Sequence, residues 1–211
     1  MSDAFAHHEL YDIAPRRLAG AGSLRRAIDV AVAALALSLL AVVALVLLVL
    51  NPLFNPGPLL YRQTRMGRRG EGFSMLKFRS MRTAAAQRTF DAPLEVHRIT
   101  PLGAWLRRTR LDELPQIVNV LRGEMSLIGP RPDAWDHAKV FLERVPDYRR
   151  RLTVRPGMTG LAQVELGYAE GLSATAEKVG VDLSYIRGRT WQLDAAILWR
   201  TVKLVAAAGG R

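Results

Sequence analysis

The chain of 211 residues contains no cysteine. Disulfide bonds, a thiol nucleophile and a cysteine-based zinc site are therefore excluded. Acidic residues are also scarce, because 19 Asp and Glu stand against 30 Lys and Arg, which gives a formal net charge of +11. This excess of positive charge suits nucleic acid, an anionic membrane surface or a phosphorylated substrate equally well. Hydrophobic residues make up 49% of the chain, which argues against disorder and predicts one domain with a real core.

Proline and glycine are absent between residues 30 and 50, where Ser38 is the one polar residue. As a helix, this stretch would be roughly 30 Å long, which is the thickness of the hydrocarbon core of a bilayer. It is too long for the apolar region of a signal peptide, and no clear cleavage site follows it. We therefore predict a membrane helix and turn over residues 25–58, behind a partly disordered leader at residues 1–24.

Both flanks of this helix are cationic. They carry the following residues: Arg16, Arg17, Arg25 and Arg26 before the helix, and Arg62, Arg65, Arg68, Arg69 and Lys77 after it. A spanning helix would leave one of these flanks outside the cytoplasm, against the positive-inside rule. A re-entrant helix keeps both flanks inside, and we favour it, with the proline-rich turn at residues 52–58 leading back. Re-entry normally needs a break in the helix, and none is visible here, so a spanning helix stays open.

The remaining residues, 59–211, are predicted to form a cytoplasmic catalytic domain. It begins with two strand-like runs, Leu59 to Gln63 and Phe73 to Arg79, which flank a glycine-rich basic connection. This arrangement predicts a β-hairpin. Because alternate residues of a strand share a face, Lys77 and Arg79 are expected to lie side by side, either toward a site or on a charged edge strand.

Further along, residues 134–151 predict a helix that ends in three arginines. Residues 184–207 combine Trp and Leu with interspersed Arg and Lys, which is typical of a helix in the headgroup region, although packing against the core explains the pattern as well. The predicted fold class is α/β and membrane-associated. It has an N-terminal re-entrant membrane helix, followed by a small helix-rich domain with a β-hairpin and interfacial amphipathic helices.

The stretch RRTRLDELPQIVNVLRGEMSLIGPRP, residues 107–132, combines two adjacent acids with five arginines. Apolar residues at helical spacing place Asp112 and Glu113 near the start of an amphipathic helix. Carboxylates beside guanidinium groups at the positive end of a helix stay ionised and suit a nucleophile or a metal ligand, while the arginines hold phosphate. The alternative is a capping box from Thr109 to Asp112 on a solvated helix. In the later run RLTVRPGMTGLAQV, a turn presents Arg155 to a binding loop.

Three motifs in order, KFRSM (77–81), RLDELPQIVNVLRGEMSLIGPRP (110–132) and RPGMTGLAQV (155–164), stand behind an apolar N-terminal segment. Together they closely resemble the bacterial sugar transferases called monotopic phosphoglycosyl transferases. The resemblance covers residues 25 to the C-terminus. It implies an enzyme at the cytoplasmic face of the bacterial inner membrane that moves a hexose 1-phosphate from a UDP-sugar to polyprenyl (undecaprenyl) phosphate. UMP leaves, and the lipid product starts exopolysaccharide, capsule or O-antigen synthesis.

Residue by residue, the resemblance implies that Asp112 attacks the sugar-bearing phosphorus and that Glu113 helps to hold Mg²⁺. Arg107 matches a family arginine that contacts phosphate. We predict that four further cations also contact phosphate: Lys77, Arg79, Arg131 and Arg155. The chain departs from the family at one point, because the Ser-Pro break near the middle of the membrane helix has no counterpart at about Ala41 and Val42.

Two other functions are compatible with the composition. A membrane-anchored nucleic-acid-binding domain would use the same arginines but would tolerate loss of the acid pair. A non-catalytic membrane scaffold would keep the fold and the lipid contacts without turnover. Because the acid pair is intact, we predict no nucleic-acid partner. A second copy of the chain, as a homodimer, is kept open.

Overall fold

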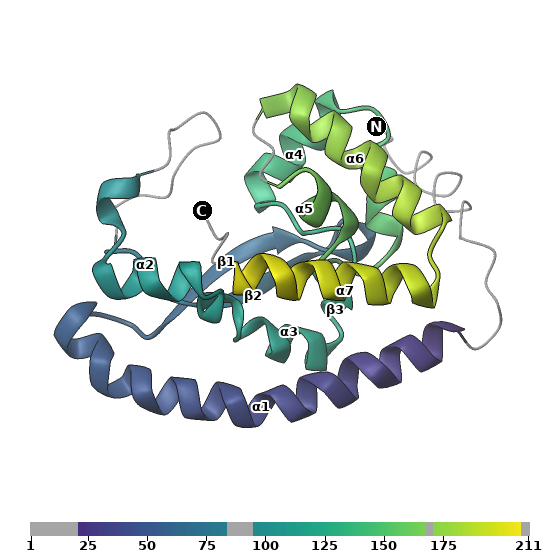
Figure 1. The fold of residues 1–211 in the computed structure, drawn as a ribbon. Coiled ribbons are helices and arrows are strands. Elements are labelled where there is room, and N and C mark those ends of the chain that lie inside the picture. The colour runs from purple at the N-terminus through teal and green to yellow at the C-terminus, as the bar shows by residue number, and fades with distance from the viewer. Residues whose placement is uncertain (1–20, 84–94, 168–170, 208–211) are drawn as a thin grey trace.

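The computed structural model describes residues 21–83, 95–167 and 171–207 (Figure 1). Most of the predicted leader lies outside these residues, and its last four, 21–24, form the first turn of a helix. The helices are α1 (Ala21–Phe54), α2 (Pro101–Arg108), α3 (Gln116–Arg122), α4 (Trp135–Arg144), α5 (Leu161–Glu165), α6 (Gly171–Arg187) and α7 (Trp191–Ala206). The strands are β1 (Leu60–Met66), β2 (Gly72–Phe78), β3 (Ser126–Ile128) and β4 (Gly157–Thr159).

Helix α1 is continuous over 34 residues and runs along one side of the rest of the structure (Figure 1). The turn predicted over residues 52–58 begins only after Phe54, because Pro52 is still part of α1. The backbone N–H of Asn55 still donates to the carbonyl of Asn51 at 2.9 Å, so the helical bonding continues past the proline. The predicted N-terminal apolar helix is confirmed, and it has no break in its middle.

One face of α1 packs against the domain. The residues of this face recur at helical spacing: Ala33, Ala36, Leu40, Val43 and Leu47. The opposite face is open, with Leu35 77% exposed and Val49 68% exposed. Among the described residues, α1 is the one helix long and apolar enough to cross a membrane, and only 11% of its most apolar stretch is buried. A core helix of a water-soluble domain is mostly buried, and this stretch of α1 is not.

Polar contacts tie the N-terminal end of α1 to the domain. The guanidinium of Arg26 donates to the carbonyls of Val120 and Leu121 at 2.6 and 2.9 Å, and so caps the C-terminal end of α3. The carboxylate of Asp29 accepts from the hydroxyl of Ser126 at 2.8 Å and from the N–H of the next residue at 3.1 Å. Asp29 is 7% exposed, so these bonds are shielded from water.

The C-terminal end of α1 is tied to the same domain. The side-chain amide of Asn55 donates to the carbonyl of Arg79 at 2.7 Å, and its side-chain oxygen accepts from the Arg79 guanidinium at 3.0 Å. The side-chain oxygen of Asn51 accepts from the same guanidinium at 3.5 Å. Both ends of α1 are therefore bonded to one side of one domain.

Strands β1 and β2 form the predicted antiparallel hairpin, in which Tyr61 pairs with Lys77 and Gln63 with Met75. Helix α3 lies between the hairpin and α1 (Figure 1). Its buried face meets Met75 of β2 and Ala33 of α1 in one cluster. The predicted hairpin is therefore confirmed, and α3 connects it to α1.

A second, parallel pair of strands, β3 and β4, was not predicted. It brings the Gly-Pro-Arg-Pro turn after β3 next to the Arg-Pro-Gly segment that leads into β4 at Gly157. The two chains approach so closely that a Cβ atom on Gly157 would overlap the backbone of Gly129. Glycine is therefore required at Gly157, because any side chain would push the two turns apart.

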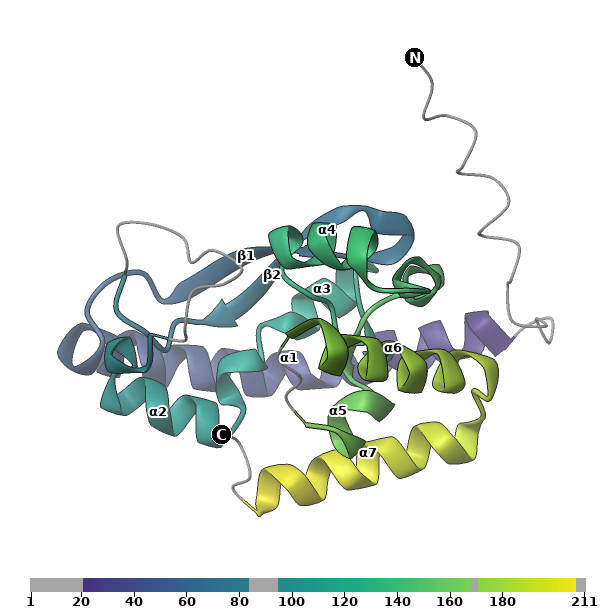
Figure 2. The same ribbon diagram turned by 90° about the horizontal axis from the view of Figure 1, so that it is seen from above.

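Helices α4, α5 and α6 lie on the side of the hairpin away from α1, and α7 lies along another side (Figures 1 and 2). The helix predicted over 134–151 is divided into α4 and a 3₁₀ helix, η5 (Tyr148–Thr153), by the left-handed backbone of Asp147, with φ of 59°. The helix predicted over 184–207 is the end of α6 plus α7. The hydroxyl of Thr190 accepts from the N–H of Leu193 at 3.2 Å and caps α7.

Candidate active site

Asp112 and Glu113 do not start an α-helix, as the sequence predicted, but lie in a short 3₁₀ helix, η4 (Leu111–Glu113). Arg110 has a left-handed backbone, with φ of 59°, and turns the chain away from the direction of α2. Pro115 then separates η4 from α3. The alternative interpretation, a capping box from Thr109 to Asp112, is excluded too, since the Thr109 hydroxyl donates back to the carbonyls of Trp105 and Leu106 at the end of α2. The acids therefore sit between two helices, on a turn that faces β2.

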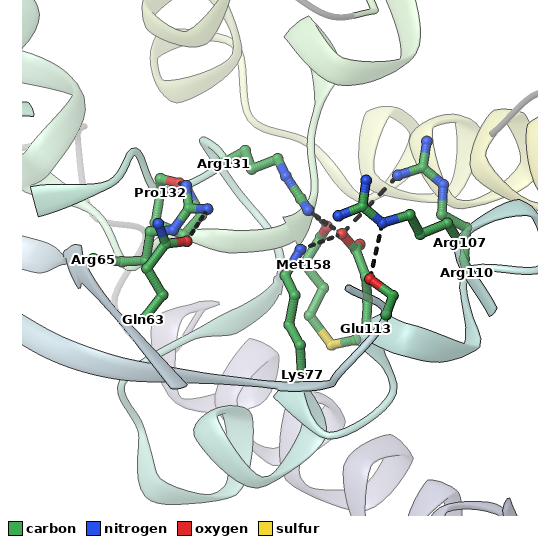
Figure 3. Close-up of polar contacts among 10 residues, drawn as sticks. Gln63, Arg65, Lys77, Arg107, Arg110, Glu113, Arg131, Pro132 and Met158 are labelled. Carbon is green, nitrogen blue, oxygen red and sulfur yellow. Dashed lines mark hydrogen bonds and ion pairs between the residues drawn. The ribbon is translucent and has the colours of Figure 1, made fainter. Parts of the chain in front are cut away.

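Three cations surround the carboxylate of Glu113 (Figure 3). The ammonium of Lys77 lies 2.9 Å from Oε1, the guanidinium of Arg131 is bonded to the same oxygen, and Arg110 lies 4.0 Å from it. Burial alone would raise the pKa of Glu113, but Arg131 and Lys77 outweigh it and hold this pKa well below its usual range. Glu113 is therefore ionised at neutral pH and sits in a positively charged surrounding.

The neighbouring Asp112 is 7% exposed, and its Oδ1 atom has no hydrogen-bond partner among the described residues. Burial raises the pKa of Asp112, the charge of Lys77 opposes that rise, and the charge of Glu113 adds to it. A carboxylate with little water around it and one oxygen free of hydrogen bonds is more reactive than a solvated one. These features make Asp112 the candidate nucleophile of the acid pair.

Arg107, in the last turn of α2, also reaches this site (Figure 3). Its Nε atom donates to the hydroxyl of Ser80 at 2.8 Å, and its charge lowers the pKa of Asp112. Lys77, Arg107 and Arg131 come from β2, α2 and the turn after β3. The structure thus brings three of the five predicted phosphate-binding cations to the acid pair.

The other two predicted phosphate-binding cations lie elsewhere. Arg79 follows the end of β2, so the alternation that would pair it with Lys77 has stopped, and its guanidinium donates to Asn55, to Pro58 and to Met81. Arg155 donates from Nε to the carbonyl of Gly123 at 2.8 Å, at the C-terminal end of α3. Both residues have structural partners, and we do not propose either as a phosphate ligand.

Arg65 is a site residue that the sequence analysis missed. Its guanidinium donates to the carbonyl of Pro132 at 3.0 Å and to the side chain of Gln63 at 2.6 Å (Figure 3). Burial, followed by the charge of Arg131, lowers the pKa of Arg65 to about 10. The predicted strand ended at Gln63, two residues short of Arg65. The observed strand β1 continues to Met66, and its register puts Arg65 on the hairpin face shared with Lys77.

The three arginines predicted to end the helix over residues 134–151 differ in their surroundings. Arg151 is buried, and its guanidinium bonds Asp133, the carboxylate of Asp182 at 2.8 Å and the carbonyl of Arg131 at 2.7 Å. Asp133 is further bonded to Lys178 at 2.7 Å. This network of two acids and two bases, in which Arg151 and Asp182 are buried and Asp133 and Lys178 are half-buried, holds the turn that carries Arg131 and so supports the site.

Comparison with known proteins identifies the family to which the chain belongs. Residues 21–208 match the model of the family described as "Bacterial sugar transferase". The chain is 42% identical over 190 residues to a UDP-glucose:undecaprenyl-phosphate glucose-1-phosphate transferase of Caulobacter vibrioides, covering 86% of this chain and 66% of that one. It is 37% identical over 191 residues to a UDP-N-acetylgalactosamine-undecaprenyl-phosphate N-acetylgalactosaminephosphotransferase of Aeromonas hydrophila, covering 89% and 44%.

The chain is also 40% identical over 190 residues to the exopolysaccharide production protein PSS of Rhizobium leguminosarum, covering 85% of this chain and 93% of that one. It therefore spans less than two thirds of the Caulobacter and Aeromonas relatives but nearly all of the Rhizobium one. The family match extends from the first turn of α1 to the end of α7 and includes every residue of the site. The chain belongs to the bacterial sugar transferase family.

Proposed function

We propose that the protein transfers a hexose 1-phosphate from a UDP-sugar to polyprenyl phosphate, through a phosphosugar covalently bound to Asp112. The observation that carries this proposal is the buried carboxylate of Asp112 beside a cluster of cations. The names of the Caulobacter and Aeromonas relatives support the donor and the acceptor. The name of the Rhizobium relative supports a role in exopolysaccharide production.

In the first step, a carboxylate oxygen of Asp112 attacks the sugar-bearing phosphorus of the diphosphate. A bond from this oxygen to phosphorus forms, the bridging bond to UMP breaks, and its electron pair leaves on the UMP phosphate. An ionised carboxylate needs no general base for this attack. It does need cations to offset the repulsion between two anions, and Lys77, Arg107 and Arg131 are proposed to supply them.

In the second step, a phosphate oxygen of polyprenyl phosphate attacks the same phosphorus. The bond from phosphorus to Asp112 breaks, the carboxylate is regenerated, and the polyprenyl diphosphate sugar leaves. UMP departs before the lipid reacts, so this scheme gives ping-pong kinetics.

Mg²⁺ is proposed as the cofactor, with Glu113 as its protein ligand. Among the described residues no group of three His, Cys, Asp or Glu side chains converges on one point. Mg²⁺ commonly takes only one or two carboxylates and completes its shell with substrate phosphates and water, so the acid pair is proposed to hold it, although Glu113 is paired with Lys77 and Arg131 in this structure. When bound, the ion would neutralise diphosphate charge.

We further propose that α1 lies in the cytoplasmic face of the bacterial inner membrane without crossing it. Its polar anchors, Asp29 and Asn51, are separated by roughly 33 Å of helix, about the thickness of a bilayer core. Both anchors bond the same domain. If α1 spanned the membrane, charged parts of that domain would lie in the hydrocarbon region, which is energetically costly. The open face of α1, together with Trp199 and Val202 of α7, would then contact lipid.

This topology predicts where introduced cysteines react. The chain has no cysteine of its own, so Leu24→Cys, in the first turn of α1, and Arg69→Cys, after the C-terminal end of α1, each provide one reporter. An impermeant thiol reagent should label neither variant in intact cells and both variants in permeabilised cells. Labelling of one variant alone in intact cells would show that α1 spans the membrane.

The activity itself is tested with purified protein in detergent, Mg²⁺, undecaprenyl phosphate, and UDP-glucose or UDP-N-acetylgalactosamine as donor. We expect UMP release with at least one of these donors. Release beyond one UMP per enzyme should require the lipid acceptor, and all release should stop when EDTA removes the metal. A protein that leaves every UDP-sugar intact would contradict the proposal. A homodimer remains a prediction, and light scattering of the same sample tests it.

A further inference from the structure

Ser80 lies where three parts of the chain meet, in the segment that follows β2. Its side chain is buried, and its carbonyl accepts from the N–H of Thr100 at 3.4 Å. The next residue, Met81, forms a bridge with Ile99, and the N–H of Arg82 donates to the carbonyl of Arg98 at 2.9 Å. The segment after the hairpin is thus fixed against the chain that leads into α2.

Helix α2 then packs directly on Ser80. The hydroxyl of Thr100 accepts from the N–H of Gly103 at 3.0 Å and caps the helix, and Pro101 occupies its first turn. A Cβ atom on Gly103 would overlap the carbonyl of Ser80, so glycine permits this approach. Arg107 follows Gly103 by four residues and therefore lies on the same face of α2.

From this face the Nε atom of Arg107 donates to the hydroxyl of Ser80 at 2.8 Å. We infer that Ser80 is a positioning residue, which orients the guanidinium of Arg107 toward the diphosphate of the donor. The inference rests on the proposed function, in which Arg107 is a phosphate ligand. It gives Ser80 a role in turnover although Ser80 itself touches no substrate.

The chemistry of the guanidinium explains why this one bond matters. An arginine side chain has several freely rotating bonds, and its loss of freedom on binding opposes the binding of phosphate. The bond at Nε fixes the plane of the group and uses one of its five N–H donors. The other four, on Nη1 and Nη2, have no protein acceptor within residues 21–83, 95–167 and 171–207 and are available in a fixed direction.

A double-mutant cycle on kcat/KM for UMP release tests the inference. Ser80→Ala is expected to lower kcat/KM about tenfold, the usual effect of one hydrogen bond to a charged group. Arg107→Ala is expected to lower it about a hundredfold. The double variant should match Arg107→Ala alone, because Ser80 acts through Arg107. Both single variants should change the same parameter, kcat or KM.

Ser126→Ala is the matched control. Ser126 is buried as Ser80 is, and its hydroxyl bonds Asp29 at 2.8 Å instead of an arginine. In the Ser126→Ala and Arg107→Ala double variant, the two losses of kcat/KM should multiply. Thermal unfolding of both serine variants shows how much of each loss comes from reduced stability. Ser80→Thr, which keeps the hydroxyl, should recover most of the activity that Ser80→Ala loses.

The outcomes separate the inference from the proposed function. Full activity of Ser80→Ala, or losses that multiply in the Ser80→Ala and Arg107→Ala double variant, would overturn the role of Ser80 alone. Full activity of Arg107→Ala would overturn Arg107 as a phosphate ligand and the role of Ser80 with it. Absence of UMP release from the unaltered protein would overturn both the inference and the proposed function.

Discussion

Replacing Asp112 by asparagine is expected to lower the rate of UMP release by a factor on the order of 10⁴ or more. The amide has nearly the same size and shape, but it is neutral and cannot attack phosphorus. Because burial raises the pKa of Asp112, the folded protein gains little from its charge, and the Asp112→Asn variant should keep the thermal stability of the parent. Loss of turnover without loss of fold is therefore the expected result, measured as UMP release and as thermal unfolding of the same sample.

The control for this variant is Asp136→Asn. The side chain of Asp136 is 71% exposed on α4, where it pairs with Lys139 at 3.3 Å. The same chemical change at this position should alter the rate by less than about twofold, since exposed pairs contribute little. Unchanged turnover of Asp112→Asn would show that another group attacks the phosphorus.

The second large effect is expected in stability, from Arg151→Met. The Arg151 side chain is 2% exposed and pairs with two carboxylates, Asp133 and Asp182, which have Lys178 as their remaining cation. Removing one partner from a buried ion network leaves charge uncompensated and costs about 3–5 kcal/mol. The Arg131 carbonyl loses its donor at the same time, so the turn that carries Arg131 should loosen.

Arg150→Met is the matched control for this stability measurement. Arg150 is the preceding residue, its side chain is 40% exposed, and it pairs with Asp147 at 3.2 Å in contact with water. Its replacement should change the free energy of unfolding by about 0–1 kcal/mol. Thermal unfolding in detergent compares the two variants, and equal stability of both would contradict a structural role for the buried network.

Local patterns predicted the elements whose partners are close in sequence. The apolar run of α1 and the hairpin of β1 and β2 were foreseen because helix length and strand alternation are properties of the segment itself. The parallel pair of β3 and β4 was missed, since its strands are about 30 residues apart and each is three residues long. Three residues are too few to show the alternation of apolar and polar residues by which a strand is recognised.

The site was foreseen in its residue types and only partly in its arrangement. Asp112, Glu113, Arg107, Lys77 and Arg131 were named from one chemically dense stretch and one strand, and they do converge. Arg79 and Arg155 carry the same charge but bond backbone and asparagine oxygens, a difference that depends on the tertiary fold. The left-handed backbone at Arg110, which turns the acids into a 3₁₀ helix, has no glycine to signal it.

The most direct test of the mechanism is to trap the proposed intermediate. Purified protein is mixed with Mg²⁺ and the UDP-sugar that supports turnover, without polyprenyl phosphate, and is then quenched and digested for mass spectrometry. We predict that the peptide containing Asp112 gains the mass of one sugar phosphate, and that undecaprenyl phosphate added before the quench removes it. An adduct on another residue, or stoichiometric UMP release with no adduct at all, would contradict covalent transfer through Asp112.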